Sequence, residues 1–218
     1  MRRIIRLLAR LLIVAIVGLI AYETWRVFEA RSETRALIDQ RLAVAREQNI
    51  TLPPERVDIL LKVEDPSFWE NAGYDFETPG AGATTLTQGL GKLLYFKQFT
   101  PGFEKIELVL IARFALTPLA TKEEILTATL ATASFGRRDG KPVIGFAEAA
   151  KVWFGRDLAA LTDDDYIGLV AMLIGPNGLD PVYHAEAHAE RVGRIKRLLA
   201  GECTPAGWSD ASLEGCAS

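Results

Sequence analysis

Two short segments near the middle of this 218-residue sequence carry the residues best suited to chemistry. In the first, Glu64 and Asp65 end an apolar stretch and are followed by the aromatic pair Phe68-Trp69. A carboxylate in a partly desolvated, apolar setting has a raised pKa and can serve as a general base. The alternative reading is a pair of solvated acids at the end of a helix.

The second segment is glycine-rich and reads GAGATTLTQ over residues 80–88, with Lys92 about one turn later. Thr85 and Gln88 have the spacing of a capping box, which predicts that a helix begins here. Backbone N–H groups at a helix N-terminus, threonine hydroxyls and a lysine together suit an anion such as phosphate. The spacing of a P-loop is absent. Simple capping by Thr85 is the alternative.

The rest of the chain predicts a mainly α fold, because no alternating strand pattern and no internal repeat is found. A charged helical stalk over residues 23–48 should end before Pro53-Pro54, since a proline pair cannot continue a helix. Further helices are predicted over 56–64, from Thr85 onward, over 104–116, after the Thr121-x-x-Glu124 capping box, and over 146–154, 162–174 and 185–199.

The N-terminus has the pattern of a membrane anchor. Residues 11–22 are continuously apolar, and the apolar character reaches back to Ile4, close to the ~20 residues that span a bilayer. The span is preceded by four arginines at positions 2, 3, 6 and 10, and Trp25 follows it. This charge asymmetry predicts a cytoplasmic N-terminus and a body on the far side. A cleaved signal peptide and a surface helix are the alternatives, although no small-x-small pair follows Tyr22.

Charge and cysteine usage exclude two classes of protein. Beyond the first ten residues, 21 basic residues face 28 acidic ones, the reverse of what a nucleic-acid-binding protein shows. The two cysteines, Cys203 and Cys216, are not in a C-x-x-C arrangement, so zinc and thioredoxin-type sites are not expected. They either form a disulfide beyond the membrane or remain free thiols.

Taken together, residues 55–200 resemble family 51 glycosyltransferases, the peptidoglycan polymerases found alone or joined to penicillin-binding transpeptidases. The first family motif, ED-x-x-F…G-x-D, appears as Glu64, Asp65, Phe68, Gly73 and Asp75. The second, G-G-S-T-I-T-Q-Q-x-x-K-N, appears as GATTLTQGLGKL over residues 82–93. The later segments with the family's order and spacing are KEEIL (122–126), SFG (134–136), GFAEAAKVWFG (145–155), LTDDDYIGLVAMLIGPNGLDP (161–181) and the basic stretch 191–199.

The resemblance implies a lysozyme-like helical domain that joins lipid-linked disaccharide-peptide units. In this reaction the acceptor's sugar 4-hydroxyl attacks the anomeric carbon of the donor, with inversion and loss of undecaprenyl pyrophosphate. Glu64 matches the family's base, and a divalent cation (Mg²⁺ or Mn²⁺) at the pyrophosphate is compatible with the family. The residues expected to bind substrate are Asp65, Phe68, Thr84, Thr85, Thr87, Gln88, Lys92, Lys105 and Arg113.

The sequence departs from the family's later motifs. In the third motif, R-K-x-x-E, alignment on Lys105 puts Leu108 at the position of the second glutamate, and Glu107 lies one residue early. One residue turns a helical side chain by about 100°. Glu107 is nevertheless the candidate for the second catalytic carboxylate. The sequence also departs from the residues usual in the family's motifs at six other positions, which are Asn71, Gly89, Leu93, Thr127, Thr129 and Ala131.

Three functions are compatible with these residues. They are a peptidoglycan glycosyltransferase acting on lipid II, a catalytically impaired homologue that binds lipid-linked precursor or a cell-wall partner, and a lysozyme-like hydrolase. The sequence has no S-x-x-K or K-T-G element, so a monofunctional enzyme is expected. Expected partners are lipid II, lipid-linked glycan, the membrane and cell-wall synthesis proteins, with no nucleic acid.

The expected organisation is a single-pass protein of the bacterial inner membrane. Residues 1–25 form the cytoplasmic start and anchor, 26–52 the stalk, 53–200 the periplasmic glycosyltransferase-like domain, and 201–218 a flexible tail that contains both cysteines.

Overall fold

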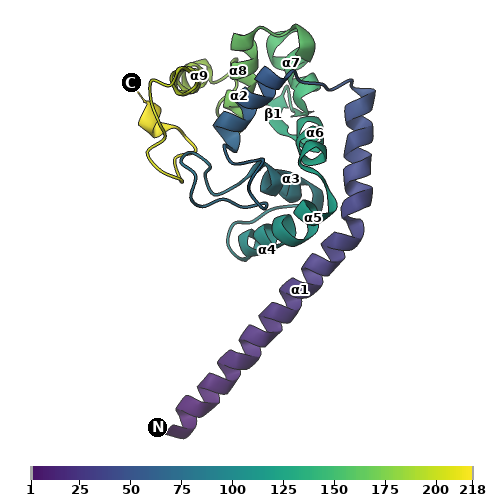
Figure 1. Cartoon of the computed structure of the whole chain (residues 1–218), viewed down its shortest axis with the longest axis vertical. Coiled ribbons are helices and arrows are strands. Elements are labelled where there is room, and N and C mark those ends of the chain that lie inside the picture. Colours follow the sequence, from purple (N-terminus) through teal and green to yellow (C-terminus); the bar gives the residue numbers. More distant parts are fainter. Residues whose placement is uncertain (1, 218) are drawn as a thin grey trace.

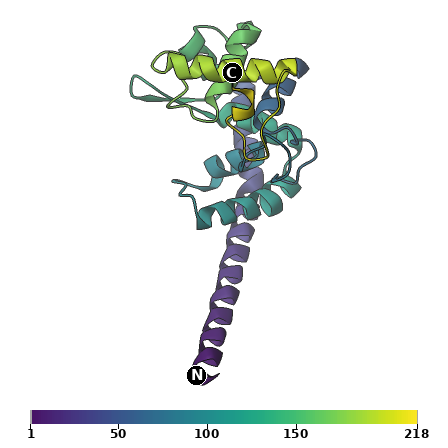
Figure 2. The same cartoon turned by 90° about the vertical axis from the view of Figure 1, so that its left-hand side faces the viewer.

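A computed structural model describes residues 2–217, and it shows a helical body from which one long helix extends (Figure 1). This helix, α1 (Arg2–Glu47), is continuous over 46 residues, so the expected anchor and stalk are one element. Its N-terminal half extends away from the body, and its C-terminal half lies along the body's side (Figures 1 and 2). The prediction of a mainly α fold is confirmed, and the N-terminal helix is long and apolar enough to span a membrane, as expected of an anchor.

The free half of α1 is long and apolar enough to cross a membrane, with a mean hydropathy of 2.5 and none of its most apolar window buried. Contact with the body begins at Glu23 and continues at Ala30, Thr34, Ile38 and Ala45. These buried residues recur at intervals of four or seven, so they form one face of the helix. That face packs against α4 and α6, described below.

Helices α2 (Pro54–Glu64) and α3 (Leu86–Tyr95) are joined by a buried carboxylate. Asp65, directly after α2, accepts hydrogen bonds from the backbone N–H of Leu86 (2.9 Å) and from Asn71 Nδ2 (2.8 Å). Thr85 caps α3 as predicted, since its hydroxyl accepts the N–H of Gln88. The Gln88 side chain completes no capping box and instead donates to the carbonyl of Gly73 (3.1 Å).

The predicted helix over 104–116 is divided. It consists of α4 (Phe103–Ile111), a π-helical turn (Ala112–Leu116) and the short α5 (Thr117–Leu119). The Thr117 hydroxyl donates to the carbonyl of Ala112 (2.8 Å) across the widened turn. Next comes α6 (Lys122–Thr132), and the capping box predicted at Thr121 and Glu124 is present in full.

A two-stranded hairpin follows, which the sequence analysis did not predict. Strands β1 (Ser134–Arg138) and β2 (Lys141–Ile144) pair antiparallel. Both turn residues, Asp139 and Gly140, have positive φ, as a two-residue hairpin turn requires. The Asp-Gly dipeptide was the signal for this hairpin, but the strands are too short to show a clear alternation.

The core is assembled from helices α7 (Phe146–Phe154), α8 (Asp163–Met172) and α9 (Ala185–Ala200), with a 3₁₀ turn at Leu158–Ala160. Tyr166 on α8 is fully buried, and its hydroxyl donates to the carbonyl of Arg56 on α2 (2.9 Å). The core thereby connects α8 to the helix that carries Glu64. Other fully buried large side chains are Leu60, Phe68, Phe135, Phe146 and Leu169.

The C-terminal segment is folded against the body and does not form the expected flexible tail. Cys203 and Cys216 form a disulfide with a Cα–Cα distance of 5.3 Å, and a 3₁₀ turn spans Glu214–Cys216. Leu213 and Cys216 are completely buried. Arg197 on α9 donates through Nε to the carbonyl of Cys216 (2.7 Å). Covalent closure of a short loop allows so few residues to hold a fixed conformation.

The Asp65 link generates a stability prediction. Replacing Asp65 by Ala removes the acceptor for the Leu86 N–H and the Asn71 amide, and a buried donor without a partner costs about 1–3 kcal/mol. Asp65→Asn keeps one carbonyl oxygen as an acceptor, so its free energy of unfolding should fall less. Denaturant unfolding of the full chain in detergent measures both changes. Equal stability of Asp65→Ala and the unaltered chain would contradict this role.

Candidate active site

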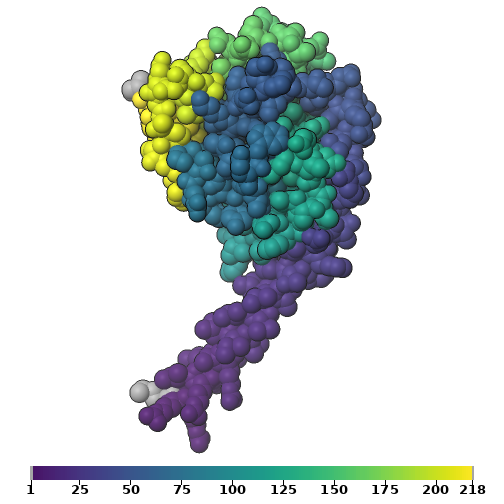
Figure 3. Space-filling model, in the orientation of Figure 1, coloured from purple at the N-terminus to yellow at the C-terminus, as the bar shows by residue number. Residues whose placement is uncertain are grey.

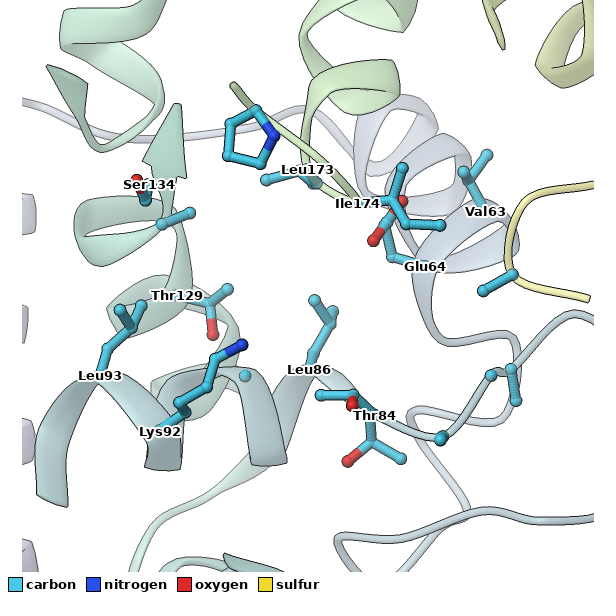
Figure 4. Close-up of a pocket in the computed structure, with 18 of the residues that line it drawn as sticks. Val63, Glu64, Thr84, Leu86, Lys92, Leu93, Thr129, Ser134, Leu173 and Ile174 are labelled. Carbon is cyan, nitrogen blue, oxygen red and sulfur yellow. The ribbon is translucent and has the colours of Figure 1, made fainter. Parts of the chain in front are cut away.

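A cavity of about 410 Å³ lies between α2, α3 and the hairpin. Figure 4 shows Glu64 on one side of it and Lys92 on the other, and the polar lining also includes Thr84, Thr129 and Ser134. The apolar wall comes from Leu86, Leu93, Leu173, Ile174 and Pro176. A cavity of this size is suited to a sugar or phosphate group, and only part of a larger substrate would enter it.

Glu64 has the electrostatic setting of a general base. It is the last residue of α2, its side chain is 16% exposed, and its Oε1 has no hydrogen-bond partner among the described residues. Burial raises the pKa of Glu64 to about 7, against the opposing effect of the Arg191 guanidinium. A carboxylate with this pKa is divided between its two protonation states near neutral pH, as a base or acid in catalysis requires.

Arg191 is the cation behind Glu64. It lies on α9 and is 5% exposed, and its guanidinium nitrogen Nη2 is 3.9 Å from Glu64 Oε1. Its three guanidinium nitrogens have no hydrogen-bond partner among the described residues. Arg191 belongs to the basic stretch 191–199, and no role is predicted for it from the sequence, because periodicity alone does not show which arginine of a basic helix turns inward.

The glycine-rich segment forms another part of the cavity wall. Residues Gly80–Thr85 line it, and α3 begins directly afterwards, so the first N–H groups of α3 lie next to the cavity wall. Lys105 on α4 lies behind this segment and donates to the carbonyl of Ala83, to Thr84 Oγ1 (2.9 Å) and to Gln88 Oε1 (2.6 Å). Burial, together with the nearby Lys92, lowers the pKa of Lys105 to about 8.

The fold and this site can be compared with known proteins. Residues 35–200 match the sequence model of the Transglycosylase family, which covers well over half of the chain. The chain belongs to the Transglycosylase family.

Several penicillin-binding proteins are similar to this Transglycosylase-family chain. Penicillin-binding protein 1B of Vibrio cholerae is 28% identical over 174 residues, which is 74% of this chain and 22% of the relative. Penicillin-binding protein 1A of Streptococcus oralis is 28% identical over 199 residues, 84% of this chain and 30% of the relative. Penicillin-binding protein 2a of Streptococcus pneumoniae is 30% identical over 164 residues, 71% of this chain and 21% of the relative. The chain thus spans less than a third of each relative's length.

Of the residues predicted from the Transglycosylase motifs, four line the cavity, namely Glu64, Thr84, Thr85 and Lys92. Lys105 lies one layer behind them. Four others are buried beneath the site, namely Asp65, Phe68, Thr87 and Gln88. Asp65 and Gln88 bond to the protein's own groups there, so their observed part is to hold the glycine-rich segment and α3 in place.

Two predicted residues lie elsewhere. Glu107 is not among the residues that line the cavity. Its carboxylate faces α1, where it accepts hydrogen bonds from Arg26 Nε (2.9 Å) and pairs with Arg26 NH2 (2.8 Å). Arg113, in the π-helical turn, lies beside the Phe114 ring at 5.6 Å and does not line the cavity. The structure therefore brings only one of the two predicted catalytic carboxylates to the cavity.

The electrostatic arrangement predicts how Glu64 titrates. Side-chain carboxyl NMR on the full chain in micelles should assign to Glu64 a pKa near 7, by comparison with Glu64→Gln. Arg191→Gln removes the cation that favours the charged carboxylate and leaves the burial, so the pKa of Glu64 should rise further. Titration of Glu64 at the ordinary glutamate pKa, or a downward shift in Arg191→Gln, would contradict the arrangement.

Proposed function

We propose that this chain is a peptidoglycan glycosyltransferase that lengthens glycan strands from lipid II and releases undecaprenyl pyrophosphate. The observation that carries the proposal is the position of Glu64. It is a buried carboxylate with a pKa near neutrality, and it faces Lys92 across a cavity in a Transglycosylase-family fold. This pairing supplies a base and a cation on opposite sides of one reacting centre.

On the acceptor side, Glu64 takes the proton of the sugar 4-hydroxyl. The hydroxyl oxygen forms a bond to the anomeric carbon of the donor, and the bond from that carbon to the pyrophosphate oxygen breaks on the opposite face. The electron pair leaves with the pyrophosphate, which inverts the configuration at the anomeric carbon. Only the deprotonated form of Glu64 accepts the proton, so its pKa near 7 keeps a useful fraction ready at neutral pH.

On the donor side, positive charge stabilises the leaving pyrophosphate. Lys92 and Thr84 both line the cavity. Lys105 holds Thr84 from behind and adds a second cation to this side. Fixed cations near a developing negative charge act strongly, because they need no reorganisation during the reaction.

The residues of this site do not fit a tightly held divalent metal. Within residues 2–217, no group of three or more His, Cys, Asp or Glu side chains is arranged to hold a metal ion. The cavity lining includes one carboxylate, Glu64, and Arg191 lies behind it. We therefore assign the neutralisation of the pyrophosphate to the ammonium groups of Lys92 and Lys105.

The proposed location is the bacterial inner membrane, with the N-terminus in the cytoplasm and the body in the periplasm. The arginines at positions 2, 3, 6 and 10 precede the apolar span, which favours this orientation. The Cys203–Cys216 disulfide is consistent with an oxidising compartment.

A second function is favoured by one specific observation. With Glu107 paired to Arg26, no second carboxylate lines the cavity within residues 2–217. A chain with this site could bind lipid-linked precursor, or a cell-wall synthesis protein, without polymerising anything. The two functions differ in whether precursor is merely retained or is converted to polymer.

The test is incubation of the purified full chain with lipid II. We expect glycan polymer from the unaltered chain. For Glu64→Gln we expect turnover reduced by about 10²–10⁴-fold, the usual contribution of a general base, with precursor binding and folding retained. If both proteins retain precursor and neither makes polymer, the chain is a precursor-binding protein and not a polymerase. Cleavage of finished glycan would indicate a hydrolase.

Two further variants locate the other groups. Lys92→Ala should weaken both precursor binding and turnover, because Lys92 faces the cavity where the pyrophosphate would lie. Glu107→Gln also removes one acid but at the contact with α1, so we expect a much smaller loss than in Glu64→Gln. An equally large loss of turnover in Glu107→Gln, with α1 still docked, would return Glu107 to the catalytic machinery.

The two titrating groups predict the pH dependence of polymerisation. The rate should rise as pH increases through about 7, because Glu64 must lose its proton to act as a base. It should fall above about 8, because Lys105 then loses its charge. Lys105→Arg keeps a cation at this position at all accessible pH values and should remove the alkaline fall. A polymerisation rate that does not change between pH 6 and pH 9, measured over an about tenfold range of substrate concentration, would contradict both assignments.

A further inference from the structure

The disulfide loop, defined here as residues 203–216, is a folded unit. Asp210 organises it from within, because its carboxylate accepts the N–H groups of Ala206 (2.8 Å), Glu214 (2.7 Å) and Gly215 (2.9 Å). The disulfide joins the two ends of the loop. A short loop with a covalent closure and a central acceptor has few alternative conformations.

One side of the disulfide loop is attached to α9. Arg194 donates to the carbonyl of Ser212 (3.1 Å) and pairs with Glu214, and Arg197 donates to the carbonyl of Cys216 (2.7 Å). Leu213 is completely buried in the core. The position of the loop is therefore fixed relative to the helix that carries Arg191.

The other side contacts the glycine-rich segment. The N–H of Gly80 donates to the carbonyl of Gly207 (3.0 Å), and the N–H of Gly82 donates to the carbonyl of Trp208 (2.6 Å). Figures 1 and 3 show the C-terminal segment beside this part of the chain. The Trp208 ring packs edge-on against Phe76 with ring centroids 5.9 Å apart.

The approach of the two segments is too close for side chains on the glycines. A Cβ on Gly80 would lie 2.8 Å from Pro205 Cγ, and a Cβ on Gly82 would lie 2.9 Å from Ala211 Cβ. Both glycines also have positive φ. The glycines of this segment therefore permit a tight contact that side chains would prevent.

This contact continues directly to the cavity. Gly80, Gly82, Thr84 and Ala211 line it, so the disulfide loop supplies part of the wall itself. The carbonyl of Ala83 and the hydroxyl of Thr84 hold Lys105. Glu64, in contrast, is held by α2 and makes none of these contacts.

We propose that the disulfide loop is a redox-sensitive positioning element that holds the glycine-rich segment, and with it Thr84 and Lys105, in the conformation that binds the donor pyrophosphate. This inference rests on the proposed function for its substrate. Reduction adds two electrons and two protons to Cys203 and Cys216, which a dithiol supplies as it becomes a disulfide itself. The reduced loop loses its closure and releases residues 80–84, while Glu64 stays in place.

Hydrogen exchange of the full chain in detergent micelles tests the inference without any substrate. After dithiol reduction, and in Cys203→Ala/Cys216→Ala, the amides of Gly80 and Gly82 should exchange at least about tenfold faster, because their acceptors belong to the released loop. Protection of α2 and α8 should not change. Unchanged protection at residues 80–84 would overturn the inference. A uniform rise in exchange rate across the whole body would also overturn it, because it would show that the disulfide only stabilises the fold in general.

Asp210→Ala provides a second test with the disulfide intact. It removes the acceptor of three loop N–H groups and should raise exchange at Gly80 and Gly82 in the same way. Gly82→Ala should clash with Ala211, whereas Gly155→Ala is a matched control at a similar positive φ with nothing within 4 Å of the added carbon. A loss of protection at Gly80 in both glycine variants would contradict the specific contact.

Kinetics connect the loop to the reaction. On reduction, the KM for lipid II should rise about tenfold while kcat changes less than about twofold, because the donor side is loosened and the base is not. A fall in kcat at constant KM would overturn the positioning role. If neither form makes polymer, the proposed function fails, and the exchange measurements still decide whether the loop holds residues 80–84.

Discussion

The site depends on one buried carboxylate, Asp65. It follows Glu64 directly in the chain, and it accepts the N–H of Leu86, the first residue of α3. The same bond therefore joins the end of the helix that carries Glu64 to the start of the helix that carries Lys92. Because a buried acceptor is costly to leave without its donor, the two helices have little freedom to separate.

Two adjacent carboxylates are made different by their partners. Burial raises the pKa of both, to about 7 for Glu64 and to about 6 for Asp65, where the Leu86 N–H and Lys122 oppose it. Asp65 uses its oxygens within the protein, whereas Glu64 keeps Oε1 without a hydrogen-bond partner among the described residues. Asp65 can therefore be structural, while Glu64 remains free to exchange a proton. Arg191 limits the cost of the free charge without binding it closely, at 3.9 Å.

Local signals predicted much of this arrangement. Thr85 and Thr121 cap their helices as predicted, because a hydroxyl three residues before a free N–H is sufficient and no distant contact is needed. Glu64 and Lys92 could be found from motif order. The direction of Glu107, the inward turn of Arg191 and the packing of residues 203–216 depend on contacts between segments far apart in the sequence. Composition and periodicity do not contain that information. The predictions of a flexible tail and of Glu107 as a second catalytic carboxylate were therefore made without the contacts that decide them.

The position of Glu107 shows how the long helix is tied to the body. Arg26 lies just after the apolar part of α1, and its pairing with Glu107 joins α1 to α4 at the level where the body begins. Thr34 and Arg35 continue this contact higher on α1, through Tyr95 and Glu124. Lys105 lies on the same α4, two residues before Glu107, and reaches Thr84. Glu107 of this short helix thus contacts the long helix and Lys105 contacts the glycine-rich segment, so α4 connects α1 to the wall of the cavity.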